Sequence, residues 1–322
     1  MNTKHTKLAL VFTLLFSCLH LRAAEQDNWY LAKDLVEPTP SNYESRGVAY
    51  HEDNATGVGK VYAIMGSSTS AYVGVFDLNG TWDRNVTIAN SRLDPTSLAL
   101  DENGTIYVAD RYSVTCLENN GTFRWRTGKY ADFSNYGTNG SGDGEFQQDN
   151  SYGTGIALGA GGKVYVTDYG NRRVQVLENN GSFVRSFGSN GSAPGQFNGP
   201  QDLVVLTDGM VVVADNSYLH YFQADGTFVR RTDSGRYNVS LAKDGTLFSN
   251  NRLLDRDGDL ITQISFIHSS YSDKMRTAFT ANGDLITHSL IHDGSYRHYL
   301  SYYKRAYRTK GLPVPNVIPQ PA

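Results

Sequence analysis

The run VYVTDYGNRRVQV, residues 164–176, decides the fold of this chain. Its first part, Val164–Thr167, is built from β-branched and aromatic residues that favour a strand. Asp168, Gly170 and Asn171 then interrupt the pattern with turn-forming residues. A second alternating stretch follows at Arg173–Val176. The run therefore predicts two antiparallel strands joined by a tight turn.

The same pattern recurs along the chain as a repeat. Each unit has a short apolar strand, a turn that ends in Gly, and a second strand that often ends in Asp. The six pairs of strands are Gly47–Tyr50 with Lys60–Ile64, Ser97–Leu100 with Gly104–Asp110, Gly155–Leu158 with Gly162–Asp168, Asp202–Val205 with Gly209–Asp215, Asn238–Leu241 with Gly245–Phe248, and Thr277–Phe279 with Gly283–Ile286. The last two pairs keep the pattern in a reduced form.

A second turn in each unit fixes the register of the repeat. These turns are Asn79-Gly80, Asn120-Gly121, Asn180-Gly181, Asp225-Gly226, Asp257-Gly258 and Asp293-Gly294. Asn-Gly and Asp-Gly between alternating strands predict hairpins, because both residues tolerate a positive φ. Four strands per unit at a spacing of about 40 residues are typical of a propeller. We therefore predict an all-β fold, a six-bladed β-propeller of four-stranded antiparallel blades.

The middle units resemble a known family, the NHL repeats of bacterial exported proteins. Residues 164–176 resemble the core of that repeat, and residues 140–146 and 191–197 resemble its Gly-rich link. Units two to four carry the resemblance. Units one, five and six depart from it, because Met65, Asn250 and either His288 or Ser289 stand where the family has Asp. The resemblance implies the same six-bladed propeller.

The ring needs a closing strand, and the sequence offers one at either end. Trp29–Ala32 and the Tyr-rich segment Tyr296–Tyr307 are both candidates. We expect the propeller to occupy residues 25–309. Residues 310–322 contain four prolines, which are incompatible with a central strand or a helix. This stretch is a Pro-rich tail, or a linker to a possible further domain.

Residues 1–24 have the features of a signal peptide. Lys4 and Lys7 precede the apolar run Leu8–Leu19, and the small residues Ala23 and Ala24 follow. The run is too short for a transmembrane span. A lipoprotein signal with Cys18 as the lipidated residue is the alternative. Either interpretation predicts a secreted, periplasmic or cell-surface protein.

Charge and cysteine content limit the possible partners. The formal charge is −3, and residues 1–24 hold three Lys or Arg and no acid, so the remainder carries −3 − 3 = −6. An acidic body argues against a nucleic-acid partner. Cys116 is the single cysteine after residue 24, so no internal disulfide can form. We expect Cys116 to be a small buried hydrophobic residue.

Several polar groups are better explained by structure than by chemistry. We expect Asp110, Asp168 and Asp215 to form turns after their strands, and Arg172 and Arg173 to brace the hairpin. The Asn of the Asn-x-Ser/Thr triplets coincides with a turn, so backbone geometry explains it. The acidic segments 255–259 and 139–145 do not match a calcium loop.

No cofactor or metal is predicted. The histidines after residue 24 show neither an HxH nor an HExxH spacing; they are His51, His220, His268, His288, His292 and His298. Propellers similar to this one nevertheless include peptidyl-amidating lyases, with a channel metal held by separated histidines, and gluconolactonase-type lactonases. An enzyme of lyase or lactonase type, with a metal at the channel mouth, therefore remains the alternative.

The candidate ligand site is the mouth of the central channel, where the innermost strands begin. Aligning the units places one polar residue from each blade there. These residues are Arg46, Thr96, Thr154, Asp202, Asn238 and Arg276. They can bind a polar ligand or a peptide, or they can merely solvate a water-filled channel. We expect an exported interaction module that binds a protein or glycan through the loops of one face.

Overall fold

The computed structural model describes residues 28–40, 47–65, 71–88, 95–132, 137–147, 154–216, 218–233, 237–264, 275–292 and 296–306. The chain divides into two compact units. One consists of Met1–Tyr30 together with Arg305–Ala322, and the other consists of Leu31–Lys304. The second unit contains the propeller. No helix in the described part of the chain has the length and apolar character needed to cross a lipid bilayer.

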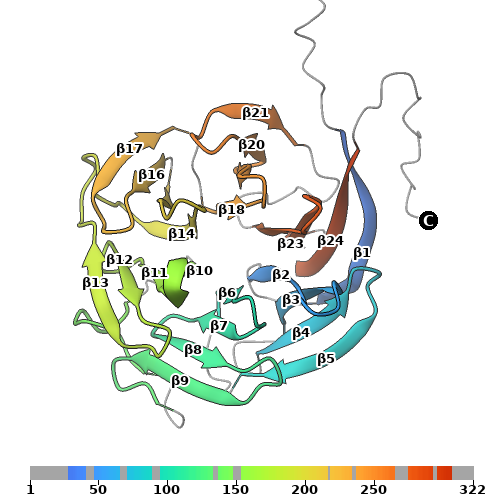
Figure 1. Ribbon diagram of the computed structural model, residues 1–322, viewed down its shortest axis with the longest axis horizontal. Coiled ribbons are helices and arrows are strands. Elements are labelled where there is room, and N and C mark those ends of the chain that lie inside the picture. The colour runs from blue at the N-terminus through green and yellow to red at the C-terminus, as the bar shows by residue number, and fades with distance from the viewer. Residues whose placement is uncertain are drawn as a thin grey trace, which may run out of the picture. The chain divides into compact units, whose positions relative to one another are not determined.

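Six four-stranded antiparallel sheets form the blades of a six-bladed β-propeller, as predicted (Figure 1). Blade one has β2 (Val48–Glu52), β3 (Gly59–Met65), β4 (Tyr72–Asp77) and β5 (Trp82–Thr87); blade two has β6 (Ser97–Leu100), β7 (Ile106–Ala109), β8 (Ser113–Leu117) and β9 (Phe123–Gly128); blade three has β10 (Ile156–Leu158), β11 (Val164–Asp168), β12 (Arg173–Leu177) and β13 (Phe183–Phe187). Blade four has β14 (Pro200–Val205), β15 (Val211–Asp215), β16 (Tyr218–Phe222) and β17 (Phe228–Thr232); blade five has β18 (Ser240–Leu241), β19 (Leu247–Ser249), β20 (Arg252–Leu254) and β21 (Leu260–Gln263).

Both ends of the chain contribute to blade six, which closes the ring. Its strands run β22 (Arg276–Phe279), β23 (Leu285–His292), β24 (Tyr296–Ala306) and β1 (Asn28–Pro40) from the inside outward. The N-terminal strand is therefore the outermost strand of the last blade. One sequence prediction is wrong here. The repeat predicts Asp293-Gly294, which lies outside the described residues, between the third and fourth strands of its blade. In the sequence it falls between the second and third strands, β23 and β24, because the fourth strand comes from the other end of the chain.

Apolar residues of adjacent blades pack into shared clusters. Tyr107 and Val114 of blade two lie in one cluster with Val164 and Val166 of blade three. Cys116 belongs to the same cluster and is fully buried, which confirms its predicted role. Burial raises the pKa of its thiol to about 12. Each blade is thus stabilised by its neighbours.

The tight turns of the blades lie on one face of the propeller, which we call the turn face. In an antiparallel blade the turns from strand one to two and from three to four share one end. Asn79, Asn120 and Asn180 each accept a hydrogen bond from the backbone N–H two residues later, at 2.9, 2.9 and 3.0 Å. Gly80, Gly121 and Gly181 follow them with positive φ. These asparagines therefore shape the backbone, as expected.

The chain passes from blade to blade on the opposite face, which we call the connection face. The connections between outer and inner strands span residues 88–96, 129–155, 188–199, 233–239 and 264–275. They vary widely in length, whereas the turns of the other face are short and alike. Loops of variable length carry function more often than tight turns do, so we expect the functional site on the connection face.

Candidate functional site

The predicted channel-mouth residues lie at the connection face, because every innermost strand begins there. Figure 1 shows β6, β10, β14 and β18 around the centre of the ring. Thr96 immediately precedes β6, and Thr154 and Asn238 lie two residues before β10 and β18. Asp202 lies within β14, and Arg276 is the first residue of β22. Arg46 lies outside the described residues.

Two threonines join blades two and three at this mouth. The Thr96 Oγ1 atom accepts a hydrogen bond from the Thr154 backbone N–H at 2.9 Å. The same hydroxyl lies 3.0 Å from the Thr154 carbonyl oxygen, to which it donates. Thr154 is buried. The pair therefore links neighbouring inner strands.

Asp202, Asn238 and Arg276 come together from three blades. The Arg276 Nη1 atom lies 2.9 Å from Asp202 Oδ2, so an ion pair reaches from blade six past blade five to blade four. Asp202 Oδ2 also accepts a hydrogen bond from the Val239 N–H at 3.2 Å. The Asn238 side chain donates to the Met275 carbonyl oxygen at 2.6 Å.

The Asp202 carboxylate has partners on both oxygens, because its Oδ1 atom accepts the Leu203 N–H at 3.0 Å. Burial raises the pKa of Asp202, and the nearby Arg276 guanidinium opposes that rise. Sequence reasoning chose these residues by their place near the start of an innermost strand and did not anticipate the ion pair of Asp202 and Arg276, because nothing local to either residue encodes the partner.

The strand-end aspartates are buried structural residues. Asp110 accepts hydrogen bonds from the Tyr112 and Ser113 N–H groups at 2.8 and 2.9 Å, so it forms the turn as predicted. Burial raises its pKa to about 6. Asp168 differs, because one of its partners lies in the long connection 129–155. It accepts a hydrogen bond from the Gln147 backbone N–H at 2.9 Å.

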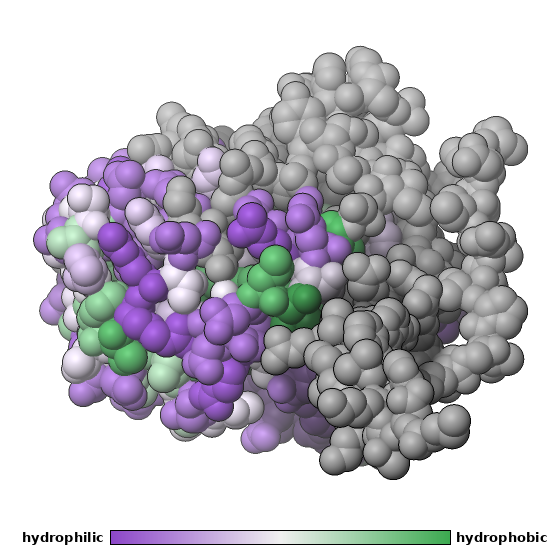
Figure 2. Space-filling model, turned by 90° about the horizontal axis from the view of Figure 1, so that it is seen from above, coloured by the Kyte–Doolittle hydropathy of each residue, from purple (hydrophilic) through white to green (hydrophobic). Residues whose placement is uncertain are grey.

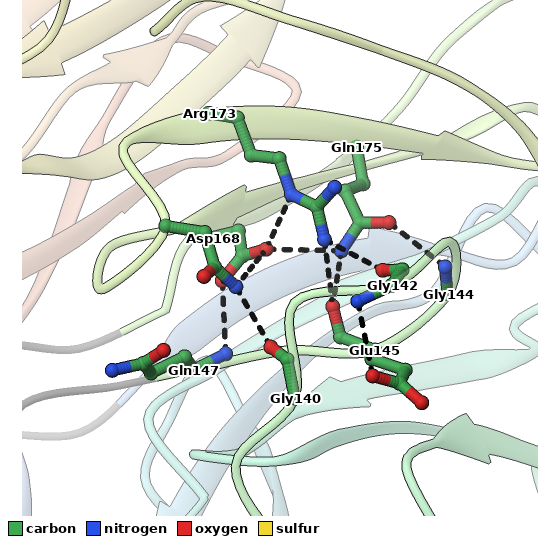
Figure 3. A network of polar contacts seen from close by, with 9 residues as sticks. Gly140, Gly142, Gly144, Glu145, Gln147, Asp168, Arg173 and Gln175 are labelled. Atoms are coloured by element: carbon green, nitrogen blue, oxygen red, sulfur yellow. Dashed lines mark hydrogen bonds and ion pairs between the residues drawn. The ribbon is translucent and has the colours of Figure 1, made fainter. Parts of the chain in front are cut away.

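Arg173 and Gln175 complete a clamp on that connection (Figure 3). The Arg173 Nε atom donates to Asp168 Oδ2 at 2.8 Å, and its Nη2 atom reaches the Gly142 carbonyl oxygen at 2.7 Å. Gln175 donates to Asp168 at 3.0 Å and accepts the Gly144 N–H at 2.9 Å. Arg173 thus braces the structure as predicted, and it holds the connection as well as the hairpin. We name Asp168, Arg173 and Gln175 the blade-three clamp.

Sequence reasoning missed an exposed aromatic residue on the connection face. Tyr130 follows β9, is 72% exposed, and has φ of 56°. A non-glycine residue in this left-handed region is uncommon, and such residues cluster at functional sites. The Lys129 ammonium lies 5.7 Å from the Tyr130 ring centroid. The signal in the sequence was weak, since Tyr is frequent throughout this chain.

The described residues contain no group of three or more His, Cys, Asp or Glu that could hold a metal ion. The described histidine side chains are separated. His51 lies near the turn-face end of blade one, where it pairs in register with Lys60. His288 lies opposite Arg276 in blade six, and His220 is in blade four.

Comparisons with known proteins agree with this fold. Residues 154–177 match the family model of the NHL repeat. A streptogramin B lyase structure is similar to this chain, with a TM-score of 0.54 and 12% identity, over 88% of this chain and 99% of that one. A protein of unknown function from Bacteroides caccae has a TM-score of 0.52 and 12% identity, over 77% and 97%. Virginiamycin B lyase from Staphylococcus aureus has a TM-score of 0.50 and 13% identity, over 84% and 88%.

At these identities the likeness concerns the fold alone. The matched segment covers the first three strands of blade three, where the sequence motif indicated the repeat. Fold does not determine function, because one scaffold supports unrelated activities. The function of this chain therefore depends on its own residues.

Proposed function

We propose that this chain is an exported binding module that takes up a protein or glycan on its connection face. The observation that carries the proposal is the asymmetry of the two faces. Short, regular turns occupy the turn face, while the connections, the channel mouth and the exposed Tyr130 share the other. A rigid scaffold that presents variable loops on one side is a common way to build a binding surface.

Tyr130 is the residue through which we expect the ligand to make contact. An exposed aromatic side chain provides a large contact area at a low cost in conformational entropy. Its unfavourable φ suggests that the position is kept for function rather than for stability. Export is proposed from the features of residues 1–24 and is tested by N-terminal sequencing of the protein released from cells.

The binding proposal is tested with residues 25–322 on a glycan array and on immobilised envelope proteins. Tyr130→Asn removes the ring while keeping a residue that tolerates positive φ. Trp82→Ala is the matched control, because Trp82 is 57% exposed but begins β5 at the turn face. We expect at least about tenfold weaker binding, or about 1.4 kcal/mol, for Tyr130→Asn alone.

Three outcomes would contradict the proposal. The first is the absence of any ligand. The second is equal binding by Tyr130→Asn and the unmodified protein, with loss only in Trp82→Ala. The third is stoichiometric, tightly held zinc or calcium in the purified protein together with lyase or lactonase turnover, since that result would favour the enzyme.

A further inference from the structure

The basic side chains near the turn face are largely neutralised by acids. Lys60 pairs with Asp77 at 2.6 Å, and Lys163 pairs with Glu178 at 2.6 Å. Further pairs are Arg84 with Asp83, Arg124 with Glu118, Arg230 with Asp257, and Arg256 with Asp208. These cations therefore have little charge left to offer a ligand.

Arg172 and Arg231, on the connection face, are different. The Arg172 guanidinium lies over the Tyr169 ring at 4.5 Å from its centroid, and that of Arg231 lies over the Tyr218 ring at 4.3 Å. Each donates to a backbone carbonyl oxygen, Arg172 to Tyr169 at 2.9 Å and Arg231 to Ser192 at 2.8 Å. Within the described part of the chain, no carboxylate forms an ion pair with either arginine.

Both arginines lie near the boundary between blades three and four. Arg172 is in the loop after β11, and Arg231 is near the end of β17. Both lower the pKa of the same buried carboxyl group, Asp215, whose pKa burial raises. Asp215 also accepts the Asn198 N–H at 2.9 Å. The connection 188–199 lies beside both arginines, because Arg231 donates to Ser192 and the Tyr169 ring, on which Arg172 stacks, packs against Gly199.

Stacking prepares these guanidinium groups to bind an anion. A tyrosine ring holds each one on one side and restricts its rotation, so less entropy is lost when a ligand binds. The guanidinium has five N–H donors in a planar fork that matches a carboxylate. Each arginine uses one carbonyl acceptor here, so donors remain for a ligand.

We infer that Arg172 and Arg231 form an anion-binding site that takes the carboxylate groups of an acidic polysaccharide. The inference rests on the proposed function, because it names the ligand class for the connection face. A uronate polymer repeats carboxylates along its length and presents sugar rings that can pack against Tyr130.

A protein ligand fits the surface less well. Protein interfaces have an apolar core. Figure 2 shows the edge of the propeller, where hydrophilic residues cover most of the described surface and hydrophobic residues form small separate groups. The exposed Val229, Leu260 and Ile261 belong to the outer strands β17 and β21. Tyr130 is the one large exposed hydrophobic residue that we find in the described connections.

The test measures binding of residues 25–322 to polygalacturonate by titration calorimetry. Fully methyl-esterified polygalacturonate is the matched ligand, because it keeps the sugar chain and removes the charges. We expect binding to the acid form only, about tenfold weaker in Arg231→Gln and in Arg172→Asn. About 1 M sodium chloride should abolish it, since the Debye length is then about 3 Å.

Arg230→Gln is the control variant. Arg230 neighbours Arg231 in β17 and also stacks on a tyrosine, with its guanidinium 3.6 Å from the Tyr221 ring centroid. It is already paired with Asp257 at 2.8 Å. The two substitutions remove the same charge, so Arg230→Gln should bind like the unmodified protein. Thermal unfolding establishes whether each variant is folded. If Arg172→Asn is not folded, the binding of Arg231→Gln compared with that of Arg230→Gln decides the test.

Equal binding of the ester, or equal losses in Arg230→Gln and Arg231→Gln, would overturn the inference. Arginine-dependent binding of poly-glutamate or RNA without binding of polygalacturonate would also overturn it. If array ligands depend on Tyr130 but not on the two arginines, this inference fails and the binding module stands. If nothing binds, both fail.

Discussion

His220 in blade four occupies the place that Gln175 occupies in blade three. Gln175 pairs in register with Val166, and His220 pairs with Val213, each two residues before a strand-end aspartate. Gln175 bonds both to Asp168 and to the connection. The two ring nitrogens of His220 have no hydrogen-bond partner, although the side chain is buried. Its Nε2 atom lies 3.7 Å from Asp215 Oδ2.

Replacing His220 by Gln should make blade four less sensitive to acid. Burial lowers the pKa of His220 to about 4, and the nearby Arg231 contributes. The folded state therefore binds its proton less readily than the unfolded state does. Stability from the neutral imidazole is fully present above about pH 6.5 and is lost as the pH falls towards 4, by at most about 3 kcal/mol.

Urea unfolding at pH 7 and pH 4.5 measures this effect. Between these values the unmodified protein should lose more free energy of unfolding than His220→Gln. Buried acids away from His220, such as Asp110, whose pKa is raised to about 6, have the opposite dependence, but they are common to both proteins and cancel in the difference. Equal losses in the two proteins would show that His220 does not titrate in this way.

Removing Asp168 should release the connection 129–155 from blade three. Asp168→Ala leaves Arg173, whose side chain is 13% exposed, without its carboxylate, and it orphans the Gln147 N–H. Loss of one partner of a buried pair costs about 3 kcal/mol. Urea unfolding gives this value, and limited proteolysis within residues 129–155 should become faster.

Asp77→Ala is the control for Asp168→Ala. Asp77 pairs with Lys60, and its side chain is 37% exposed, so its loss should cost less than about 1 kcal/mol. A similar cost for the two substitutions would mean that the blade-three clamp is no stronger than a surface ion pair.

The ion pair between Asp202 and Arg276 should couple blades four and six. Each side chain is 12% exposed, so solvent screens the pair weakly. A double-mutant cycle with Asp202→Ala and Arg276→Ala should give a coupling energy of about 2 kcal/mol in urea unfolding. The pair of Lys163 with Glu178, at 32% and 39% exposure, should give less than about 1 kcal/mol. Coupling energies that do not differ would contradict an energetic link across the channel mouth.

Local features were predictable from the sequence because their causes are local. The Asn120-Gly121 and Asn180-Gly181 turns need only neighbouring residues, and the strands of blades two to four follow from alternation between such turns. The candidate positions for the channel mouth were aligned on the same register. The repeat thus sufficed for the blades and for the start of each inner strand.

Features that depend on distant residues were not predictable. The fourth strand of blade six comes from the other end of the chain, so the turn pattern failed at Asp293-Gly294. Arg172 and Arg173 are adjacent, and both were expected to brace the hairpin. Both do so, Arg173 through Asp168 and Arg172 through the Tyr169 carbonyl oxygen. The further bond from Arg173 to the carbonyl oxygen of Gly142, which is 31 residues away, was not predictable.

Deleting residues 25–40 should open the ring at blade six. β24 would become an unpaired edge, and the backbone hydrogen bonds between it and β1 would be lost. Each contributes about 1 kcal/mol net, so the free energy of unfolding should fall by several kcal/mol, on the order of 5. An exposed edge strand also promotes association, which size-exclusion chromatography detects.

Two controls make the test of ring closure specific. Deleting residues 310–322 removes a segment of similar length outside the predicted propeller, and it should leave the unfolding midpoint unchanged. A synthetic peptide of residues 28–40, added to the protein that lacks β1, should restore the midpoint by refilling the fourth position of the sheet. If the shortened protein unfolds like the full chain, or if the peptide has no effect on its lowered midpoint, β1 does not close the ring by strand pairing.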